Sequence, residues 1–156
     1  MKRYLLLALA ALTACLAQAN FVALESEVYT ESAYGTVYRV YATFDNPTDE
    51  LVAVYALESS PMLLDVTTSF YQDAVGGTLG STINPAFYAA FPSLEFDSWF
   101  TIGSADSDGT SEIQQVGMDS AFALFEAGSG FNLNAFVGGS YFLIPNVSAD
   151  AEAGAV

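Results

Sequence analysis

TVYRVYATF, residues 36–44, decides the fold class of this chain, because nearly every position is β-branched, aromatic or apolar. Such residues favour extended backbone, and the segment contains no glycine or proline. A second run of this kind, LVAVYAL at residues 51–57, follows the polar link DNPTDE. Pro47 and the turn-forming Asp45 and Asn46 predict a hairpin that joins these two strands.

Further strands are predicted in segments of apolar or alternating composition that are bounded by glycine, proline or polar clusters. These segments are FVALESEVYT at residues 21–30, LLDVTTSFYQ at 63–72, FDSWFTIG at 96–103, EIQQVGM at 112–118 and SYFLIP at 140–145. The first two strands above are apolar on both faces, so a second packed sheet is the simplest cover for them. The sequence therefore predicts a mostly β fold, an antiparallel β-sandwich.

One short helical turn is predicted within INPAFYAAFP, residues 83–92. Asn84 suits the position that caps a helix, and Pro85 suits the first helical position, where its missing N–H costs nothing. Pro92 is expected to end the turn.

A second helical segment is predicted in MDSAFALFEAGSG, residues 118–130. Asp119 or Ser120 is the expected cap, and Gly128 the expected terminator. The sequence FALF within this segment is equally compatible with a strand.

The chain begins with a segment typical of an export signal. Two basic residues precede an apolar run at residues 5–12, which is too short to cross a bilayer. Ala17 and Ala19 form the small-residue pattern that signal peptidase prefers. A signal peptide over residues 1–19 is therefore predicted, with a mature chain that starts at Asn20.

An alternative interpretation of the same segment is a lipid anchor at Cys15, which follows Leu12, Thr13 and Ala14. Lipid-anchored proteins usually carry a flexible polar tether after the cysteine, whereas a strand is predicted here from Phe21. Secretion is therefore favoured over the anchor. The rest of the chain is expected to form one β-sandwich domain at residues 20–147, followed by a frayed acidic and alanine-rich tail at 148–156.

The charge balance is strongly acidic. After the leader, Arg39 is the one basic residue beside eighteen acidic ones, which gives a formal side-chain charge of −17. Nucleic acid and anionic membrane surfaces are repelled by such a chain. The balance suits saline water, where ions screen the self-repulsion, and a marine habitat is one explanation for it. Solubility alone is the other.

The order of these landmarks resembles a secreted β-domain that recurs in large extracellular proteins of marine bacteria and algae. The landmarks are TVYRVYATFDNPTDELVAVYAL, SFYQDAVGG, INPAFYAAFPSLEFDSWFTIG, VGMDSAFALFEAGSG and GGSYFLIP. The resemblance implies an extracellular location and a β architecture, and it carries no activity, ligand or functional residue. Members of that group continue into further strands, which implies an open edge strand here that can pair with another chain.

The chain lacks the residues that several kinds of catalysis require. The chain has no histidine, and its one cysteine and one lysine lie in the leader. Histidine-dependent nucleophiles, common zinc sites and Schiff-base chemistry are therefore excluded. Carboxylates alone remain, so we predict a protein that is not an enzyme and has no catalytic residues.

The stretch LEFDSW contains the best candidates for ligand binding, namely Glu95, Asp97 and Trp99. On a strand, the two carboxylates would face the same side, beside a ring on which a sugar can stack. The simpler interpretation is a strand with an outward acidic face and an inward apolar one.

The stretch GSADSDGTSE, residues 103–112, is a candidate calcium loop. Asp106, Asp108 and Glu112 around Gly109 offer hard oxygen ligands, although their spacing departs from that of an EF-hand. The simpler interpretation is a polar hairpin tip. Calcium is the one cofactor that the sequence suggests.

These observations predict a secreted, non-catalytic domain for extracellular structure, adhesion or surface display, stabilised by calcium if the loop binds it. Its expected partners are an extracellular protein, a glycan surface or another copy that pairs with an open strand edge. One alternative is a carbohydrate-binding module that uses Trp99 and the loop tyrosines Tyr29, Tyr34, Tyr71 and Tyr88. A less favoured alternative is a carboxylate-dependent hydrolase.

Overall fold

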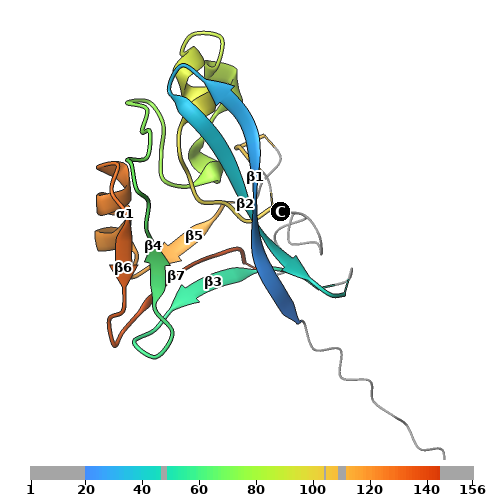
Figure 1. The fold of residues 1–156 in the computed structure, drawn as a ribbon, viewed down its shortest axis with the longest axis vertical. Helices are drawn as coiled ribbons and strands as arrows, with labels where there is room; N and C mark the ends of the chain where they lie inside the picture. The colour runs from blue at the N-terminus through green and yellow to red at the C-terminus, as the bar shows by residue number, and fades with distance from the viewer. Residues whose placement is uncertain (1–19, 47–48, 104, 109–111, 145–156) are drawn as a thin grey trace, which may run out of the picture.

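The computed structural model describes residues 20–46, 49–103, 105–108 and 112–144 (Figure 1). The predicted signal peptide and tail lie outside this part of the chain. The described strands are β1 (Phe21–Ser32), β2 (Gly35–Phe44), β3 (Ala53–Ala56), β4 (Met62–Leu64), β5 (Gln114–Val116), β6 (Phe131–Leu133) and β7 (Gly139–Phe142). The helical elements are α1 (Asp119–Glu126) and the 3-10 turns η1 (Gly80–Thr82), η2 (Pro85–Phe87) and η3 (Pro92–Phe96).

The strands pair antiparallel in three small sheets, which confirms the mostly β fold. One sheet is the β1–β2 hairpin, the second has the order β3-β7-β5, and the third pairs β4 with β6. Helix α1 lies against β6 (Figure 1). The face-to-face packing of two sheets that defines a sandwich stays a prediction.

The strand at residues 36–44 does not pair with the strand that follows it, so the predicted hairpin is wrong. β2 pairs instead with β1, in a register that sets Ser32 opposite Gly35. Gly35 has φ 130°, which is readily available only to glycine, and the Ser32 hydroxyl donates to the Gly35 carbonyl at 2.9 Å. A tight turn before residue 36 therefore closes the ladder first, and β3 pairs with β7.

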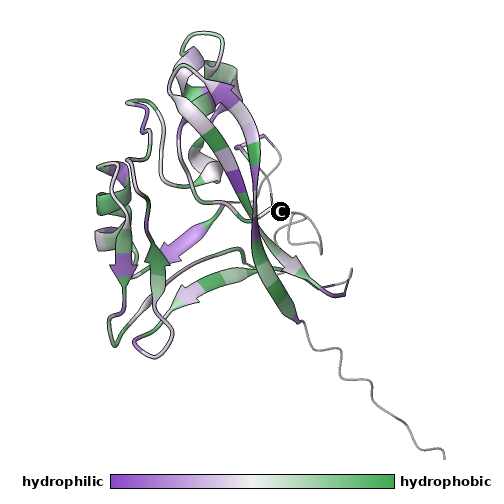
Figure 2. Ribbon diagram, viewed as in Figure 1, coloured by the Kyte–Doolittle hydropathy of each residue, from purple (hydrophilic) through white to green (hydrophobic). Residues whose placement is uncertain are grey.

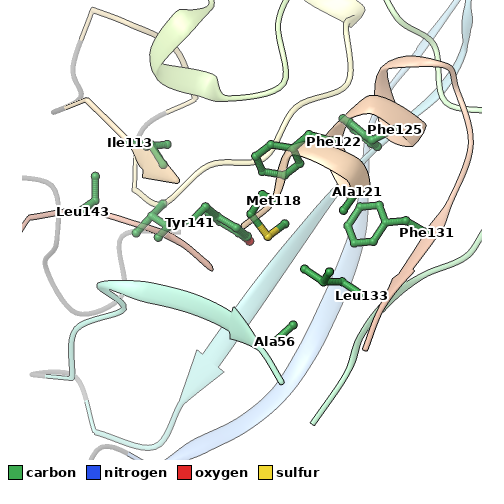
Figure 3. Packing of buried hydrophobic residues seen from close by; sticks show 11 residues of the cluster. Ala56, Ile113, Met118, Ala121, Phe122, Phe125, Phe131, Leu133, Tyr141 and Leu143 are labelled. Atoms are coloured by element: carbon green, nitrogen blue, oxygen red, sulfur yellow. The ribbon is translucent and has the colours of Figure 1, made fainter. Parts of the chain in front are cut away.

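The buried core lies between α1 and the two sheets that flank it (Figure 3). α1 buries Ala121, Phe122 and Phe125 on one side, as an amphipathic helix should. The other buried members of the cluster are Ala56, Ile102, Ile113, Met118, Phe131, Leu133, Tyr141 and Leu143. Burial raises the pKa of the Tyr141 hydroxyl to about 12, so its neutral form is the one that fits this core.

The two predicted helical segments form, although one cap differs. Asn84 caps η2 as expected, because its side chain accepts from the Ala86 amide at 2.9 Å. α1 is a helix and ends before Gly128, which has φ 80°. Neither Asp119 nor Ser120 caps it, since the capping position is Met118, whose own side chain makes no capping bond, and the Gln115 side chain accepts from the Met118 amide at 3.2 Å.

Two predicted strands are mostly absent. The segment at 96–103 follows the 3-10 turn η3 and contributes only a single bridge, between Phe100 and Leu79. The segment at 63–72 is extended only at its start, in β4. Apolar content misled the prediction in both places, because these side chains enter the core from loops instead of from a ladder.

We expect Met118→Ala to lower the free energy of unfolding by about 2–5 kcal/mol, because the Met118 side chain is completely buried between α1 and the sheet. Leu124→Ala, on the exposed side of the same helix, is the matched control and should cost less than about 1 kcal/mol. Urea denaturation of both variants measures the difference. Equal losses would contradict this description of the core.

Candidate functional site

The predicted pair of Glu95 and Asp97 does not share a face. Glu95 lies in η3 and is exposed, whereas Asp97 follows that turn and is only 5% exposed. The 3-10 geometry replaces the strand alternation on which the pairing depended. The two carboxylates therefore point into different environments.

The Asp97 carboxylate holds a neighbouring loop in place. One of its oxygens accepts from the Asp73 amide at 2.8 Å, and the other accepts from the Gly77 amide at 3.0 Å. A Cβ at Gly76 would lie 1.8 Å from Asp97 Oδ2, so the carboxylate also fills the space beside that glycine. Asp97 thus fixes the loop at residues 73–77 from inside.

The environments of the two aspartates at this loop shift their pKa values in opposite directions. Burial raises the pKa of Asp97, with the backbone donors acting against that effect. A hydrogen bond with Ser93 lowers the pKa of Asp73, aided by the Val75 amide. Both oxygens of Asp97 accept hydrogen bonds from backbone amides of the loop, so this carboxyl acts on the loop, and a role for it in ligand binding stays a prediction.

The predicted aromatic platform is partly occupied by the protein itself. Trp99 is half-buried, and its Cδ1 atom would lie 3.2 Å from a Cβ placed on Gly80. Tyr34 packs against Tyr71 with ring centroids 4.5 Å apart, and against Phe96 at 5.8 Å. These rings connect the hairpin turn to the loops around η3.

The candidate calcium loop is described at residues 105–108 and 112. Asp106 accepts from the Asp108 amide at 2.9 Å, which is the local turn that the simpler interpretation predicts. Glu112 is exposed. Within the described residues, no three acidic, histidine or cysteine side chains form a group that could hold a metal ion. Calcium binding by this loop stays a prediction.

Three of the predicted acidic candidates influence one tyrosine. Burial raises the pKa of Tyr88, and the charges of Asp106, Glu95 and Asp108 raise it further. These acids come from segments that are separated in sequence, so no local spacing could reveal their proximity. The negative charge of these three acids therefore acts on the Tyr88 hydroxyl.

Hydrophobic and hydrophilic residues alternate along the two strands of the hairpin (Figure 2), and this alternation gives it an apolar face that the sequence analysis did not single out. The register places Leu24, Val28, Tyr38 and Val40 on one side of the ribbon. These four side chains are 69%, 55%, 61% and 62% exposed. The strict alternation in LESEV and YRVYA was the available signal, because it describes a ribbon with one apolar and one charged face. We call these four residues the ribbon face.

The opposite side of the hairpin is polar and internally bonded. The Arg39 guanidinium stacks over the Tyr29 ring, 3.6 Å from its centroid. The Tyr41 hydroxyl donates to Glu27 at 2.5 Å, and this bond is the main cause of the raised pKa of Tyr41. Glu25, Glu27 and Arg39 therefore lie on the side away from the ribbon face, whereas Glu31, which pairs with Thr36 beyond the bulge, lies on the same side as Tyr38.

A second apolar area lies on the three-stranded sheet. Tyr55 and Val116 both lie opposite Ser140 in the ladder, on the face away from the buried Tyr141. They line a shallow depression of about 200 Å³ together with Leu57 and Val137. This face would be covered in a sandwich, and here its apolar side chains are exposed.

Comparison with known proteins finds no family model, no curated protein and no solved structure that matches this chain. The resemblance to secreted marine β-domains therefore stays a prediction. Among the described residues there is no helix with the length and apolar character needed to cross a membrane.

We expect Asp97→Asn to destabilise the fold by about 1–3 kcal/mol, because an amide nitrogen would face a backbone N–H that now has an acceptor. Glu95→Gln, two residues away and exposed, is the control and should stay within about 0.5 kcal/mol of the parent protein. Thermal denaturation at neutral pH compares the two.

The pH dependence provides a second check. A raised pKa means that folded Asp97 keeps its proton at a pH where the unfolded chain has lost it, so its contribution to stability falls as pH rises from below 3.8 through the folded pKa. The Asp97→Asn variant has no carboxyl to titrate at this position, so its stability should lack this decrease as the pH rises in the acidic range. An unchanged profile would show that burial of Asp97 does not govern its titration.

Proposed function

We propose that this protein is an exported, non-catalytic structural domain that associates with further copies of itself through the ribbon face. The observation that supports this proposal most directly is the exposure of Leu24, Val28, Tyr38 and Val40 together on one side of a two-stranded hairpin. A clustered apolar surface in contact with water is unfavourable, and burial of about 25 cal/mol per Å² favours its association. The leader predicted at residues 1–19 supports export.

A second copy is the occupant that fits the charges best. The ribbon face contains no ionised side chain, while Glu25, Glu27 and Arg39 project from the opposite side. Two ribbons can therefore meet face to face over the stretch from Leu24 to Val28 without placing acidic groups against each other, because Glu31, on the same side, lies beyond this stretch opposite Thr36. The outer edges of β1 and β2 have no strand partner within the described residues, so the paired ribbons can also extend into a larger sheet.

The size of the ribbon face sets the strength of this association. Its central part, from Leu24 to Val28 opposite Tyr38 to Ala42, is five residues long on each strand and spans roughly 17 Å at 3.4 Å per residue. Stable interfaces bury about 800 Å² on each partner, which exceeds what this part offers alone. We therefore propose weak contacts that become effective through repetition among many copies.

Salt should strengthen this association, which distinguishes it from most charge-mediated contacts. Each mature copy carries one basic and eighteen acidic side chains, so copies repel one another over long distances at low ionic strength. Screening reduces the repulsion without weakening the apolar contact.

We expect sedimentation velocity to show monomers at about 20 mM salt and concentration-dependent association at about 500 mM salt. The variant with Leu24→Thr and Val40→Thr keeps β propensity while removing apolar area, so it should stay monomeric under both conditions. Leu63→Thr, which changes a similarly exposed residue on β4, is the matched control and should behave like the parent. Association that the ribbon variant leaves unchanged would refute the role of the ribbon face.

Calcium is proposed as a stabiliser of the loop that carries Asp106, Asp108 and Glu112, because these residues offer hard oxygen ligands and Asp106 and Asp108 lie two residues apart on one turn. Extracellular calcium sites have millimolar affinity, so about 10 mM calcium at a dissociation constant of about 1 mM adds about 1.4 kcal/mol. We expect the melting temperature to rise by about 3 °C or more with calcium and to respond less to magnesium. Asp106→Asn with Asp108→Asn should abolish the response, and equal responses in parent and variant would exclude this site.

A further inference from the structure

Asn20 is the first described residue and lies just before β1. Two carboxylates hold it. The Asn20 amide nitrogen donates to Asp49 Oδ2 at 3.1 Å, and the Asn20 side-chain nitrogen donates to Asp45 Oδ2 at 2.8 Å. The Asp45 amide donates back to the Asn20 carbonyl at 3.3 Å, which extends the β1–β2 ladder by one step. Three hydrogen bonds thus hold Asn20 in place, and one of them sets its backbone nitrogen against Asp49.

Asp49 is one of two buried acidic side chains in the described structure, with 6% of its surface exposed. A buried carboxylate costs several kcal/mol unless a positive group or several donors face it. No lysine follows the leader, and the one arginine is stacked on Tyr29 in the hairpin. Within the described residues, no basic side chain of the mature domain therefore supplies Asp49 with a counter-charge.

We propose that removal of the leader between Ala19 and Asn20 creates the missing counter-charge, because the new α-ammonium group lies against the buried Asp49 carboxylate. Before cleavage the Asn20 nitrogen is a neutral amide with one proton to donate. After cleavage it carries a positive charge and three donors, at the place where 3.1 Å already separates it from Asp49 Oδ2. Leader removal then stabilises the fold, so the mature chain is more stable than its precursor.

The distance between the Asn20 amine and Asp49 also defines which cleavage position gives this gain in stability. Adding or removing one residue shifts the amine by about 3.4 Å along the strand, which takes it out of hydrogen-bond distance of Asp49. Acylation at Cys15 would leave the Asn20 nitrogen as an amide. The inference rests on export as proposed above and is independent of association through the ribbon face.

The test compares three forms of the chain. One starts at Asn20 with a free α-amino group, the second is the same chain acetylated at that amine, and the third retains Ala19. Acetylation is selective here, because the mature chain has no lysine and the α-amine is its one primary amine. At about pH 6 we expect the free-amine form to melt at least about 3 °C above the other two.

Asp49→Asn is the critical variant, because it removes the charge and keeps the shape. In this variant the free and acetylated forms should melt at the same temperature. Asp45→Asn is the matched control, since Asp45 binds the Asn20 side chain, and most of the gap should persist in it. A gap that survives Asp49→Asn, or no gap in the parent chain, would overturn the proposal.

A pH series tests the pair of the Asn20 amine and Asp49 without any substitution. The proposal can therefore be tested even if Asp49→Asn does not fold. α-Amino groups normally titrate near pH 8, and the carboxylates of Asp49 and Asp45 favour the charged form. The gap between free and acetylated chains should be complete from about pH 6 to about pH 8 and should disappear as the pH rises through the pKa of the amine in the folded chain. A gap independent of pH would also overturn it. Amino-terminal sequencing of the exported full chain separately shows whether cleavage occurs at Asn20.

Discussion

Phe100 is the ring on which the packing of the domain depends. Its centroid lies 5.4 Å from that of Phe122, 4.7 Å from Phe125, 6.0 Å from Phe131 and 5.5 Å from Tyr141. One residue from a loop therefore joins α1, β6 and β7, and aromatic pairs at these distances add to the energy of burial. The backbone of the same residue bonds to the segment at 78–80, with the Gly80 amide donating to the Phe100 carbonyl at 2.8 Å.

The sequence predicted most elements of the fold and failed on their pairing. Period-two and apolar patterns located β1, β2, β3, β5 and β7, and the helical pattern located α1. Pairing depends on loop closure and on distant partners: β2 is paired through a turn at Gly35, and β3 meets β7 far along the chain. Apolar content alone could not show that Phe100 and its neighbours enter the core from a loop.

The sequence analysis named the residues of the candidate site but did not predict how the fold arranges them. Asp97 was selected for its proximity to Trp99, but the turn that begins at Pro92 replaces strand alternation and turns the carboxylate inward. Asp106 and Asp108 form the local turn that such residues favour, and their proximity to Tyr88 needed the folded chain. The ribbon face was visible as an alternating pattern, although its exposure depends on what the rest of the chain leaves uncovered.

The stacking of Arg39 on Tyr29 has a consequence for digestion by proteases. After the leader, Arg39 is the one residue that trypsin-like proteases recognise, and it lies in mid-strand opposite Glu27. Proteases bind their substrates as extended segments separated from other strands, so the hairpin must open before this bond is accessible. The rate of digestion by such enzymes is therefore set by opening of the hairpin, and the rest of the mature domain offers them no point of attack.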